Sequence, residues 1–517
     1  MMKKIRSWIK ENRLEAVILT SIVLLAAFFR LYRVSEYMTF LGDEGRDVII
    51  VRRLLTNFDP ILIGPGTSIG NMYLGPIYYY LMAPFLLLAN FSPVGPAVFI
   101  ALLGVATCVF VWFVSREWFG KIAAMIALLL YSISPVVINY SRSSWNPNIM
   151  PFFALLTIYS VWRLWRYSEL KWVIICMISF AFTLQSHYLG LLLGPVVVFF
   201  WLLVFLKIRK QKSGRKAVKG KFLKYTLLGG LFFATLMSPL VIFDARHGWQ
   251  NFSAIRTFFL ERQTTVSARP WSALPKFLPL TRKIVTRLLG GTNEILGKWL
   301  MVVFGAGVLW IVSKFISLGV KDKKNAAFFL LSVWLGFAFL GLGLYKQEIY
   351  DHYYGFFFPA PFLFVGGVVQ TFLEKRRFSL FHVLLGVFFA VLVFANLAVN
   401  PLIYPPNRQM QRAESVAERI RAEARGERFN LAVIAERNYE DGYQYFLEKW
   451  RQPVYDIDPL KLEETLATTL FVVCELPKEK CDPTHNPKAE IANFGWSKVD
   501  GEWQVSGVTV YKLTHTE

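Results

Sequence analysis

The segment Phe40–Asp47 places two carboxylates side by side between glycines. Its sequence is Phe-Leu-Gly-Asp-Glu-Gly-Arg-Asp, so Asp43 and Glu44 stand between Gly42 and Gly45. Because glycine allows close backbone approach, the pair suits a tight turn at which a bound molecule meets the chain. One carboxylate can accept a proton from a hydroxyl while the other orients a base, a sugar hydroxyl or a cation. We therefore predict Asp43 and Glu44 as catalytic residues; the alternative is a solvated acidic loop.

Four arginines in polar segments are candidates for binding an anion. Arg46 follows the acid pair, and Arg142, Arg246 and Arg256 lie between apolar runs. A guanidinium can bind two phosphate oxygens at once, which suits a phosphate-bearing substrate. Arg246 with His247 is the best candidate because it directly follows an apolar run. The alternative for each arginine is an anchor at a membrane surface.

The segment Tyr140–Asn148 carries hydrogen-bonding side chains but no acid. We predict Asn146 and Asn148 as substrate-binding residues, although amides are poor ligands for a divalent cation. We therefore predict no cofactor; a divalent cation has no support in this segment. The alternative is structural, since Asn146 before Pro147 can cap a helix that begins near Ile149.

Two histidines lie where an apolar run meets a polar segment. His187 follows Gln-Ser, and His352 precedes Tyr353 in the sequence Tyr-Asp-His-Tyr-Tyr. Polar side chains at that depth can line a sugar pocket, so we predict His187, His352 and Tyr353 as substrate-binding residues. Their spacing matches no zinc motif, and we predict no metal site. The alternative is a hydrogen-bonded histidine at the membrane interface.

The composition indicates which elements position these residues. Of the 517 residues, 55% are hydrophobic and 18% are charged, and the mean hydropathy is +0.42. Apolar runs of about twenty residues can cross roughly 30 Å of hydrocarbon as helices. The net charge of +22 comes mainly from short segments between these runs, which is typical of cytoplasmic loops rather than of nucleic-acid binding. We therefore predict a multi-pass plasma-membrane protein with no nucleic-acid partner.

Eleven segments have the apolar character of membrane spans. They are Ala16–Tyr32, Pro96–Ser115, Ile122–Tyr140, Ile149–Leu164, Trp172–Ser186, Gly190–Leu206, Tyr225–Phe243, Trp299–Ser313, Ala326–Leu344, Gly355–Phe372 and Leu380–Val399. With a cytoplasmic N-terminus, all inner loops but the first are strongly basic, so the alternation is consistent. This orientation places every candidate residue named above on the outer side.

The apolar segment Tyr73–Phe91 does not fit this alternation, because a twelfth span would reverse every later loop. Gly75-Pro76 and Pro84 are expected to break a continuous helix, so we predict a half-inserted or interfacial segment. Its three consecutive tyrosines, residues 78–80, suit a membrane-interface belt. In the long outer loop 244–298, Phe252 and neighbouring aromatics at helical spacing predict an amphipathic helix on the membrane, either a lid for a lipid tail or an anchor.

Residues 401–517 have the pattern of a soluble α/β domain outside the membrane, and residues 1–400 form the membrane domain. We expect helices at Ala413–Ala424 and Tyr439–Trp450, and strands at Leu431–Ala435, Thr469–Cys474 and Trp503–Leu513. Cys474 and Cys481 pair if this domain faces an oxidising compartment and are otherwise free thiols. Because the domain shows no nucleophile, phosphate-loop or metal motif, we predict an accessory or acceptor-binding role.

This layout resembles the membrane GT-C glycosyltransferases, and more narrowly the protein O-mannosyltransferase and aminoarabinose-transferase branch (glycosyltransferase family 39). The resemblance covers about the first 400 residues: the basic N-terminus, the first span, the Asp-Glu-Gly-Arg loop and the Gly-Pro-x-Tyr-Tyr-Tyr return. It implies a sugar donor on a polyprenyl or dolichyl phosphate, with Asp43 as general base and Glu44 positioning substrate. Many such enzymes carry another acid in the second outer loop, which this chain lacks.

The predicted function is an inverting, metal-independent transfer of a sugar from a polyprenyl-phosphate donor to an acceptor hydroxyl on the outer face. Besides this donor, the expected partners are membrane lipids and an acceptor that is a protein, a lipid or a glycan. The alternative function is a transporter or flippase for a lipid-linked sugar, which would use the same groove without bond cleavage. Transporters often show internal repeats, and none is evident here.

Overall fold

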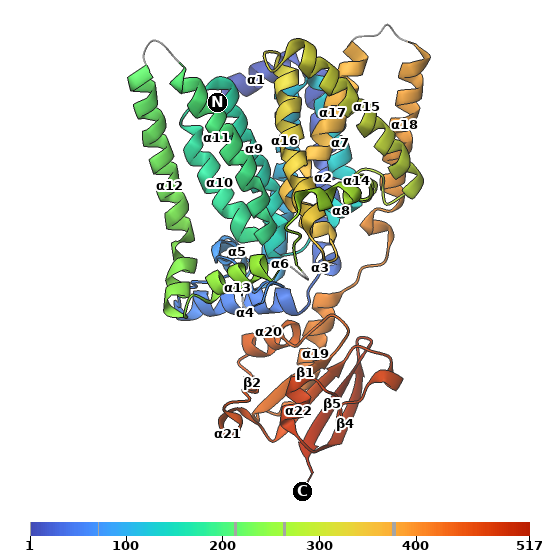
Figure 1. Cartoon of the computed structure of the whole chain (residues 1–517). Helices are drawn as coiled ribbons and strands as arrows, with labels where there is room; N and C mark the ends of the chain where they lie inside the picture. Colours follow the sequence, from blue (N-terminus) through green and yellow to red (C-terminus); the bar gives the residue numbers. More distant parts are fainter. Residues whose placement is uncertain (1, 71, 211–214, 262–264, 375–378, 517) are drawn as a thin grey trace.

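A helical membrane region and a five-stranded C-terminal domain make up the molecule, and its N-terminus lies at the end of the helical bundle opposite this domain (Figure 1). The computed structural model describes residues 2–70, 72–210, 215–261, 265–374 and 379–516. The α-helices of the membrane region are α1 (Met2–Glu11), α2 (Arg13–Leu31), α3 (Val34–Tyr37), α4 (Gly42–Asn57), α5 (Ile77–Leu88), α6 (Val94–Trp118), α7 (Lys121–Ile133), α8 (Pro135–Asn139), α9 (Met150–Tyr167), α10 (Trp172–Ser186), α11 (Gly194–Arg209), α12 (Arg215–Arg246), α13 (Gln250–Leu260), α14 (Leu274–Leu288), α15 (Glu294–Leu318), α16 (Lys323–Leu344), α17 (Pro359–Glu374) and α18 (Leu380–Ala398). The 3-10 turns η1 (Asn146–Ile149), η2 (Tyr188–Leu193), η3 (Pro270–Ala273), η4 (Asp351–Phe357) and η5 (Pro401–Ile403) lie between them.

A helix occupies each of the eleven segments predicted to span the membrane. Among the described residues, five helical stretches are long and apolar enough to cross a bilayer, and a sixth qualifies if η4 and α17, bent by 60°, count as one span. Several of the other apolar helices are shorter because 3-10 turns and proline breaks replace their ends. The protein is therefore a multi-pass membrane protein, and eleven crossings stay a prediction.

One predicted span, Ile122–Tyr140, is broken at Ser134 into α7 and α8. Pro135 has no N–H to donate and starts α8, so the last carbonyls of α7 need other partners. Arg30, fully buried on α2, supplies one by donating from Nη1 to the Ser132 carbonyl at 3.1 Å. The Ser134 hydroxyl donates to the Leu288 carbonyl at 2.7 Å. These two hydrogen bonds stabilise the interruption between α7 and α8.

The segment Tyr73–Phe91 forms only the twelve-residue helix α5, about 18 Å long, which is too short for a full crossing. The helix starts after Gly75-Pro76 as predicted, but Pro84 lies inside it and does not break it. The prediction of a membrane-interface belt is also wrong for Tyr78 and Tyr79. Both side chains are buried inside the protein, where their hydroxyls form hydrogen bonds with Ser144 and Asp47 respectively.

The C-terminal domain is a mixed sheet with strand order β2-β1-β3-β5-β4. Its elements are α19 (Gln409–Ala424), β1 (Phe429–Ile434), α20 (Asp441–Lys449), β2 (Val454–Tyr455), α21 (Leu462–Thr465), β3 (Thr469–Cys474), η6 (Lys478–Lys480), α22 (Ala489–Phe494), β4 (Ser497–Val505) and β5 (Val508–His515). Strands β2, β1 and β3 are parallel, and β5 is antiparallel to β3 and β4. The predicted strand Trp503–Leu513 is a hairpin instead: Ser506 and Gly507 both have positive φ, the requirement of a tight two-residue turn.

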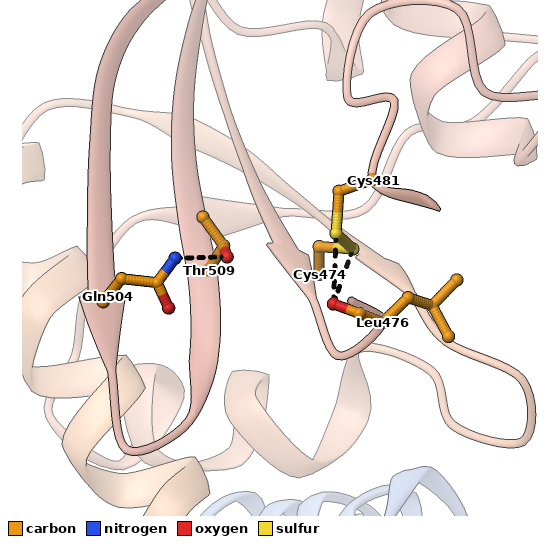
Figure 2. Close-up of a disulfide and its surroundings, with 5 residues drawn as sticks. All are labelled: Cys474, Leu476, Cys481, Gln504 and Thr509. Carbon is orange, nitrogen blue, oxygen red and sulfur yellow. Dashed lines mark hydrogen bonds between the residues drawn. A yellow bond between two sulfur atoms is a disulfide. The ribbon is translucent and has the colours of Figure 1, made fainter. Parts of the chain in front are cut away.

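Cys474 and Cys481 form a disulfide, with a Cα–Cα distance of 6.1 Å, which decides the alternative that the sequence left open. Figure 2 shows the pair beside Leu476, while a hydrogen bond from Gln504 to Thr509 joins β4 and β5. Side chains alternate between the two faces along the buried strands. One face, which includes Cys474, packs against α22, and the other face packs against α19 and α20.

The membrane region and the C-terminal domain share one hydrophobic cluster. Phe40, before α4, packs at 5.8 Å between ring centroids against Phe446 of α20. Gly45 and Gly442 bring the two helices into backbone contact, because a Cβ at Gly45 would lie 2.3 Å from the Gly442 nitrogen. The sheet domain is thus docked onto α4, which lies across the end of the bundle (Figure 1).

Candidate functional site

The acid pair lies in the first turn of α4 rather than in the predicted loop. Leu41 is extended and α4 begins at Gly42, so Asp43 and Glu44 sit at the helix N-terminus, where free N–H groups favour carboxylates. Glu44 Oε2 accepts a hydrogen bond from the Leu41 N–H at 3.0 Å. Helix α4 therefore turns two neighbouring acids in different directions.

Asp43 is the exposed member of the pair. Its side chain is 44% accessible, and its Oδ1 accepts hydrogen bonds from the Tyr439 hydroxyl at 2.5 Å and from Arg46 Nη1 at 2.9 Å. Glu44 is buried, and this burial raises its pKa to about 7, against the lowering effect of the hydrogen bond from Leu41. Asp43 is thus the carboxylate that a substrate can reach.

Arg46 binds a third acid that the sequence-based site did not include. Asp47 is fully buried, and its Oδ1 accepts from Arg46 Nη2 at 2.8 Å and from the Tyr79 hydroxyl at 3.0 Å. Burial raises the pKa of Asp47 to about 6, and the Arg46 charge opposes this. The Asp-x-x-Arg-Asp spacing could have indicated that Arg46 pairs with acids on the same helix, since residues three apart on a helix are neighbours. Arg46 is therefore a bridge between carboxylates.

One hollow, which we call the acid cavity, has a volume of about 660 Å³ and lies between the helical bundle and the C-terminal domain. It joins the acid pair to polar and aromatic side chains from five parts of the chain. Its wall consists of Tyr37, Thr39, Leu41, Gly42, Asp43, Glu44, Val136, Asn139, Tyr140, Arg142, Ser143, Trp145, Asn148, Arg287, Asp351, Val399, Pro401, Tyr404, Pro405, Asn407, Arg437 and Tyr439.

Arg142 and Asn148, two of the predicted substrate-binding residues, line the acid cavity, and their side chains donate hydrogen bonds to backbone carbonyls. Arg142 is 2% exposed and donates from its two Nη atoms to the carbonyls of Phe29 and Tyr32, at the end of α2. The Asn148 amide donates to the Ser143 carbonyl at 2.8 Å. Arg142 therefore binds carbonyls at the end of α2 and lines the cavity at the same time.

Two further cations in this wall were missed. Arg287 on α14 forms an ion pair with Asp351, and Arg437 follows β1 in the C-terminal domain. Arg437 is exposed, and among the described residues no hydrogen bond or ion pair engages its guanidinium. No local sequence pattern marks either arginine, since both reach the cavity only through the tertiary fold.

His187, His352 and Tyr353 pack together, in what we call the aromatic cluster. The His187 ring lies 5.7 Å from His352 and 5.1 Å from Tyr353, and Nδ1 of His187 accepts from the Leu189 N–H. His352 also lies 4.7 Å from Trp145, which lines the acid cavity. The cluster therefore stands directly behind one wall of the cavity.

A second hollow, the apolar groove, has a volume of about 200 Å³ and lies among Ile69, residues 72–75, α10, α12 and α13. Tyr188 lines it and stacks at 4.3 Å on His187. The aromatic cluster thus separates the apolar groove from the acid cavity. The other groove residues are almost all apolar: Ile69, Met72, Tyr73, Leu74, Gly75, Leu184, Gln185, Leu191, Met237, Leu240, Asn251, Ile255, Phe258 and Phe259.

The remaining predicted residues line neither hollow. Arg246 and Arg256 are exposed on α12 and α13, and His247 stacks on Phe243 at a centroid distance of 4.0 Å. The Asn146 amide donates to the Ser186 carbonyl at 2.7 Å and makes no helix cap. Within the described ranges, no three His, Cys, Asp or Glu side chains gather into a metal site.

Comparisons with known proteins give two kinds of match. Residues 74–243 match the family model described as dolichyl-phosphate-mannose-protein mannosyltransferase, and a search of curated protein sequences finds no match. Among solved structures, ArnT from Cupriavidus metallidurans bound to undecaprenyl phosphate superposes with a TM-score of 0.59 and 12% identity, over 96% of this chain and 97% of that one. The archaeal oligosaccharyltransferase AglB from Archaeoglobus fulgidus, in complex with an inhibitory peptide and a dolichol-phosphate, superposes with a TM-score of 0.55 and 15% identity, over 98% of this chain and 74% of that one. Residues 74–243 are thus similar to the dolichyl-phosphate-mannose-protein mannosyltransferase family, and the fold of the chain is the one that ArnT and AglB have.

Proposed function

We propose that this protein transfers a sugar from a polyprenyl-phosphate donor to an acceptor hydroxyl, with inversion at the anomeric carbon. The observation that carries the proposal is Asp43, a half-exposed carboxylate held by two donors in the wall of a 660 Å³ cavity. Such a carboxylate can take the acceptor proton while the acceptor oxygen attacks. The sugar–phosphate C–O bond then breaks, and polyprenyl phosphate leaves with the bonding electrons.

The two hollows suit the two ends of such a donor. The apolar groove matches an isoprenoid tail, and the acid cavity has Arg437 and Arg287 in its wall to hold a phosphate. The aromatic cluster lies between them, and sugars bind well against aromatic rings with hydrogen-bonding neighbours. Undecaprenyl phosphate in the ArnT structure and dolichol-phosphate in the AglB structure support this donor class.

The reaction that we propose is independent of a metal ion. Polyprenyl phosphate is a good leaving group whose negative charge needs cationic stabilisation more than protonation, and the arginines supply it. The hydrogen bonds from Arg46 and Tyr439 can hold the Asp43 carboxylate in place without a metal ion.

We place the acid cavity on the extracytoplasmic face of the plasma membrane, with a cytoplasmic N-terminus. Two observations support this orientation. The strongly basic segments between α9 and α10 and between α15 and α16 lie at the bundle end that carries the N-terminus, which fits the inner surface (Figure 1). The opposite domain contains the Cys474–Cys481 disulfide, and disulfides persist in oxidising compartments.

The experiment measures release of free polyprenyl phosphate from polyprenyl-phosphate sugars, mannose first, by membranes that contain the protein and a crude acceptor extract. We expect release by the native chain and at least about a thousandfold slower release by Asp43→Asn with unchanged membrane insertion. The matched control is Asp59→Asn, outside the acid cavity, which should keep full activity. Retained activity in Asp43→Asn would exclude the proposal, and movement of intact donor across vesicles without release would favour a flippase.

A further inference from the structure

The C-terminal domain touches the acid pair through one short segment, residues 438–443. Asn438 Oδ1 accepts a hydrogen bond from the Gly42 N–H at 2.8 Å, and its amide donates to Glu475 at 2.5 Å. The Tyr443 hydroxyl donates to the same Glu475 at 2.6 Å. These three bonds connect the first residue of α4 to the body of the sheet domain.

Within that segment, the Tyr439 ring packs against the backbone of Gly42. A Cβ at Gly42 would lie 2.4 Å from two ring atoms, so the contact needs glycine. The ring is thereby held in one position, and its hydroxyl points at Asp43 Oδ1, 2.5 Å away. Burial, with the nearby Asp43 charge, raises the pKa of Tyr439 well above its usual 10, so the hydroxyl keeps its proton and acts as a donor.

The two oxygens of Asp43 consequently differ. Oδ1 accepts from both Tyr439 and Arg46, whereas Oδ2 has no hydrogen-bond partner among the described residues. Donors fixed on one oxygen prevent the carboxylate from rotating, because rotation would break both bonds. Because Asp43 lines the acid cavity and its side chain is 44% accessible, the free oxygen is the one available to a hydroxyl.

Building on the proposed function, we infer that Tyr439 is a positioning residue of the C-terminal domain that fixes Asp43 so that Oδ2 receives the acceptor proton. The C-terminal domain is therefore part of the catalytic site, in contrast to the accessory role predicted from its lack of motifs. Tyr439 itself keeps its proton throughout and exchanges none with substrate. Its contribution lies in transition-state geometry, so its loss should lower kcat and leave donor binding intact.

The test compares Tyr439→Phe with Tyr443→Phe in the full-length protein, using release of polyprenyl phosphate from dolichyl-phosphate mannose or whichever donor the first assay identifies. Both variants lose a tyrosine hydroxyl of the C-terminal domain that donates to a carboxylate, Asp43 for Tyr439 and Glu475 for Tyr443, and of the two only Tyr439 lines the acid cavity. We expect Tyr439→Phe to lower kcat about 10- to 100-fold with the donor KM within twofold. Tyr443→Phe should leave kcat within about twofold.

A rescue variant separates positioning from folding. Replacing Tyr439 by p-aminophenylalanine keeps the ring and places an N–H donor where the hydroxyl lies, so kcat should return to within about threefold of the native value. Equal losses in Tyr439→Phe and Tyr443→Phe, a loss confined to KM, or no rescue would overturn the inference. Full activity of Tyr439→Phe with an inactive Asp43→Asn would overturn it and leave the proposed function standing, whereas an active Asp43→Asn would remove the proposed function itself.

Discussion

Asp43 and Glu44 are adjacent in the sequence, but their carboxylates meet different surroundings. Asp43 is half-exposed in the acid cavity and held by Arg46 and Tyr439, while Glu44 is buried and bonds the Leu41 N–H. The helix N-terminus explains the division, because successive side chains leave the first turn in directions about 100° apart. One acid is free for chemistry, and the other holds the start of α4.

The burial of Glu44 predicts a pH-dependent stability. Its pKa rises from 4.5 to about 7 on folding, so between these values the folded protein binds more protons than the unfolded chain. The free energy of unfolding must then fall as the pH rises through this window. Glu44→Gln removes this contribution, so we expect the Tm of the variant to rise relative to the native Tm between pH 5 and about pH 7, and the difference to level off above that pH.

The control for this measurement is Glu36→Gln. Glu36 has a pKa lowered to about 2 by the hydrogen bond from Arg33, so it titrates below the window and its replacement should shift Tm equally at every pH between 5 and 8. A constant Tm difference between Glu44→Gln and the native protein would contradict the prediction.

Arg437 is the second residue whose role can be tested alone. Its exposed guanidinium has no bond to lose among the described residues, so Arg437→Ala should leave Tm unchanged. If it holds the donor phosphate, the donor KM should rise about tenfold, the usual effect of losing one charged contact to an anion. Lys498→Ala, an exposed cation on β4 outside the acid cavity, should leave both values unchanged. Equal KM values for the Arg437→Ala and native proteins would remove this assignment.

At the scale of elements, the contact between α4 and α20 depends on two glycines. A methyl group at Gly45 would lie 2.3 Å from the Gly442 nitrogen and 2.4 Å from the Asp441 carbonyl carbon, and backbone atoms cannot move aside independently. Gly45→Ala should therefore separate the helices, weaken the Tyr439–Asp43 contact and lower both Tm and transfer activity, the latter at least tenfold.

The matched substitution is Gly336→Ala on α16, where an added Cβ meets no heavy atom within 4 Å. Alanine also favours the helix more than glycine does, so this variant should be as stable as the native protein or slightly more so. Activity and thermal unfolding in detergent would be measured for both. A Gly45→Ala protein with native activity would show that α4 tolerates a displaced C-terminal domain.

At the scale of the whole molecule, the Cys474–Cys481 disulfide tests the orientation that we propose. In intact cells, a membrane-impermeant maleimide should label the chain only after mild reduction, because Cys108 and Cys176 are buried. The double variant Cys474→Ser/Cys481→Ser should lose labelling and about 2 kcal/mol of stability, the loop-closure value for so short a loop. Labelling that appears only after the cells are permeabilised would contradict an extracytoplasmic domain.

The same double variant should keep its transfer activity. Cys474 packs on the sheet face that carries α22, whereas α19 and α20 cover the face that docks on α4. Neither cysteine lines the acid cavity, although Cys474 directly precedes Glu475, which accepts the hydrogen bond from Asn438. Inactivation by removal of the disulfide would show that the domain transmits changes across the sheet.

Local patterns in the sequence determined the elements that short-range physics controls. Apolar runs of about twenty residues predict helices because length and hydropathy suffice to bury them in lipid, and a helix lies at each predicted range. The patterns were less reliable at the ends of elements. Pro84 stays inside α5, and Trp503–Leu513 turns at Ser506-Gly507, because packing decides whether a proline or a turn interrupts an element.

The acid pair was also visible in the sequence, since Gly-Asp-Glu-Gly is a local pattern. Its partners were not, because a side chain's contacts depend on which distant segments the fold brings together. Tyr439 lies 396 residues after Asp43, and Arg142, a plausible phosphate ligand by type, donates instead to carbonyls at the end of α2. The sequence alone thus determined the candidate acid pair, and only the tertiary structure decided that two domains line one cavity around it, because long-range packing places Tyr439 and Arg437 in the same wall as the acid pair.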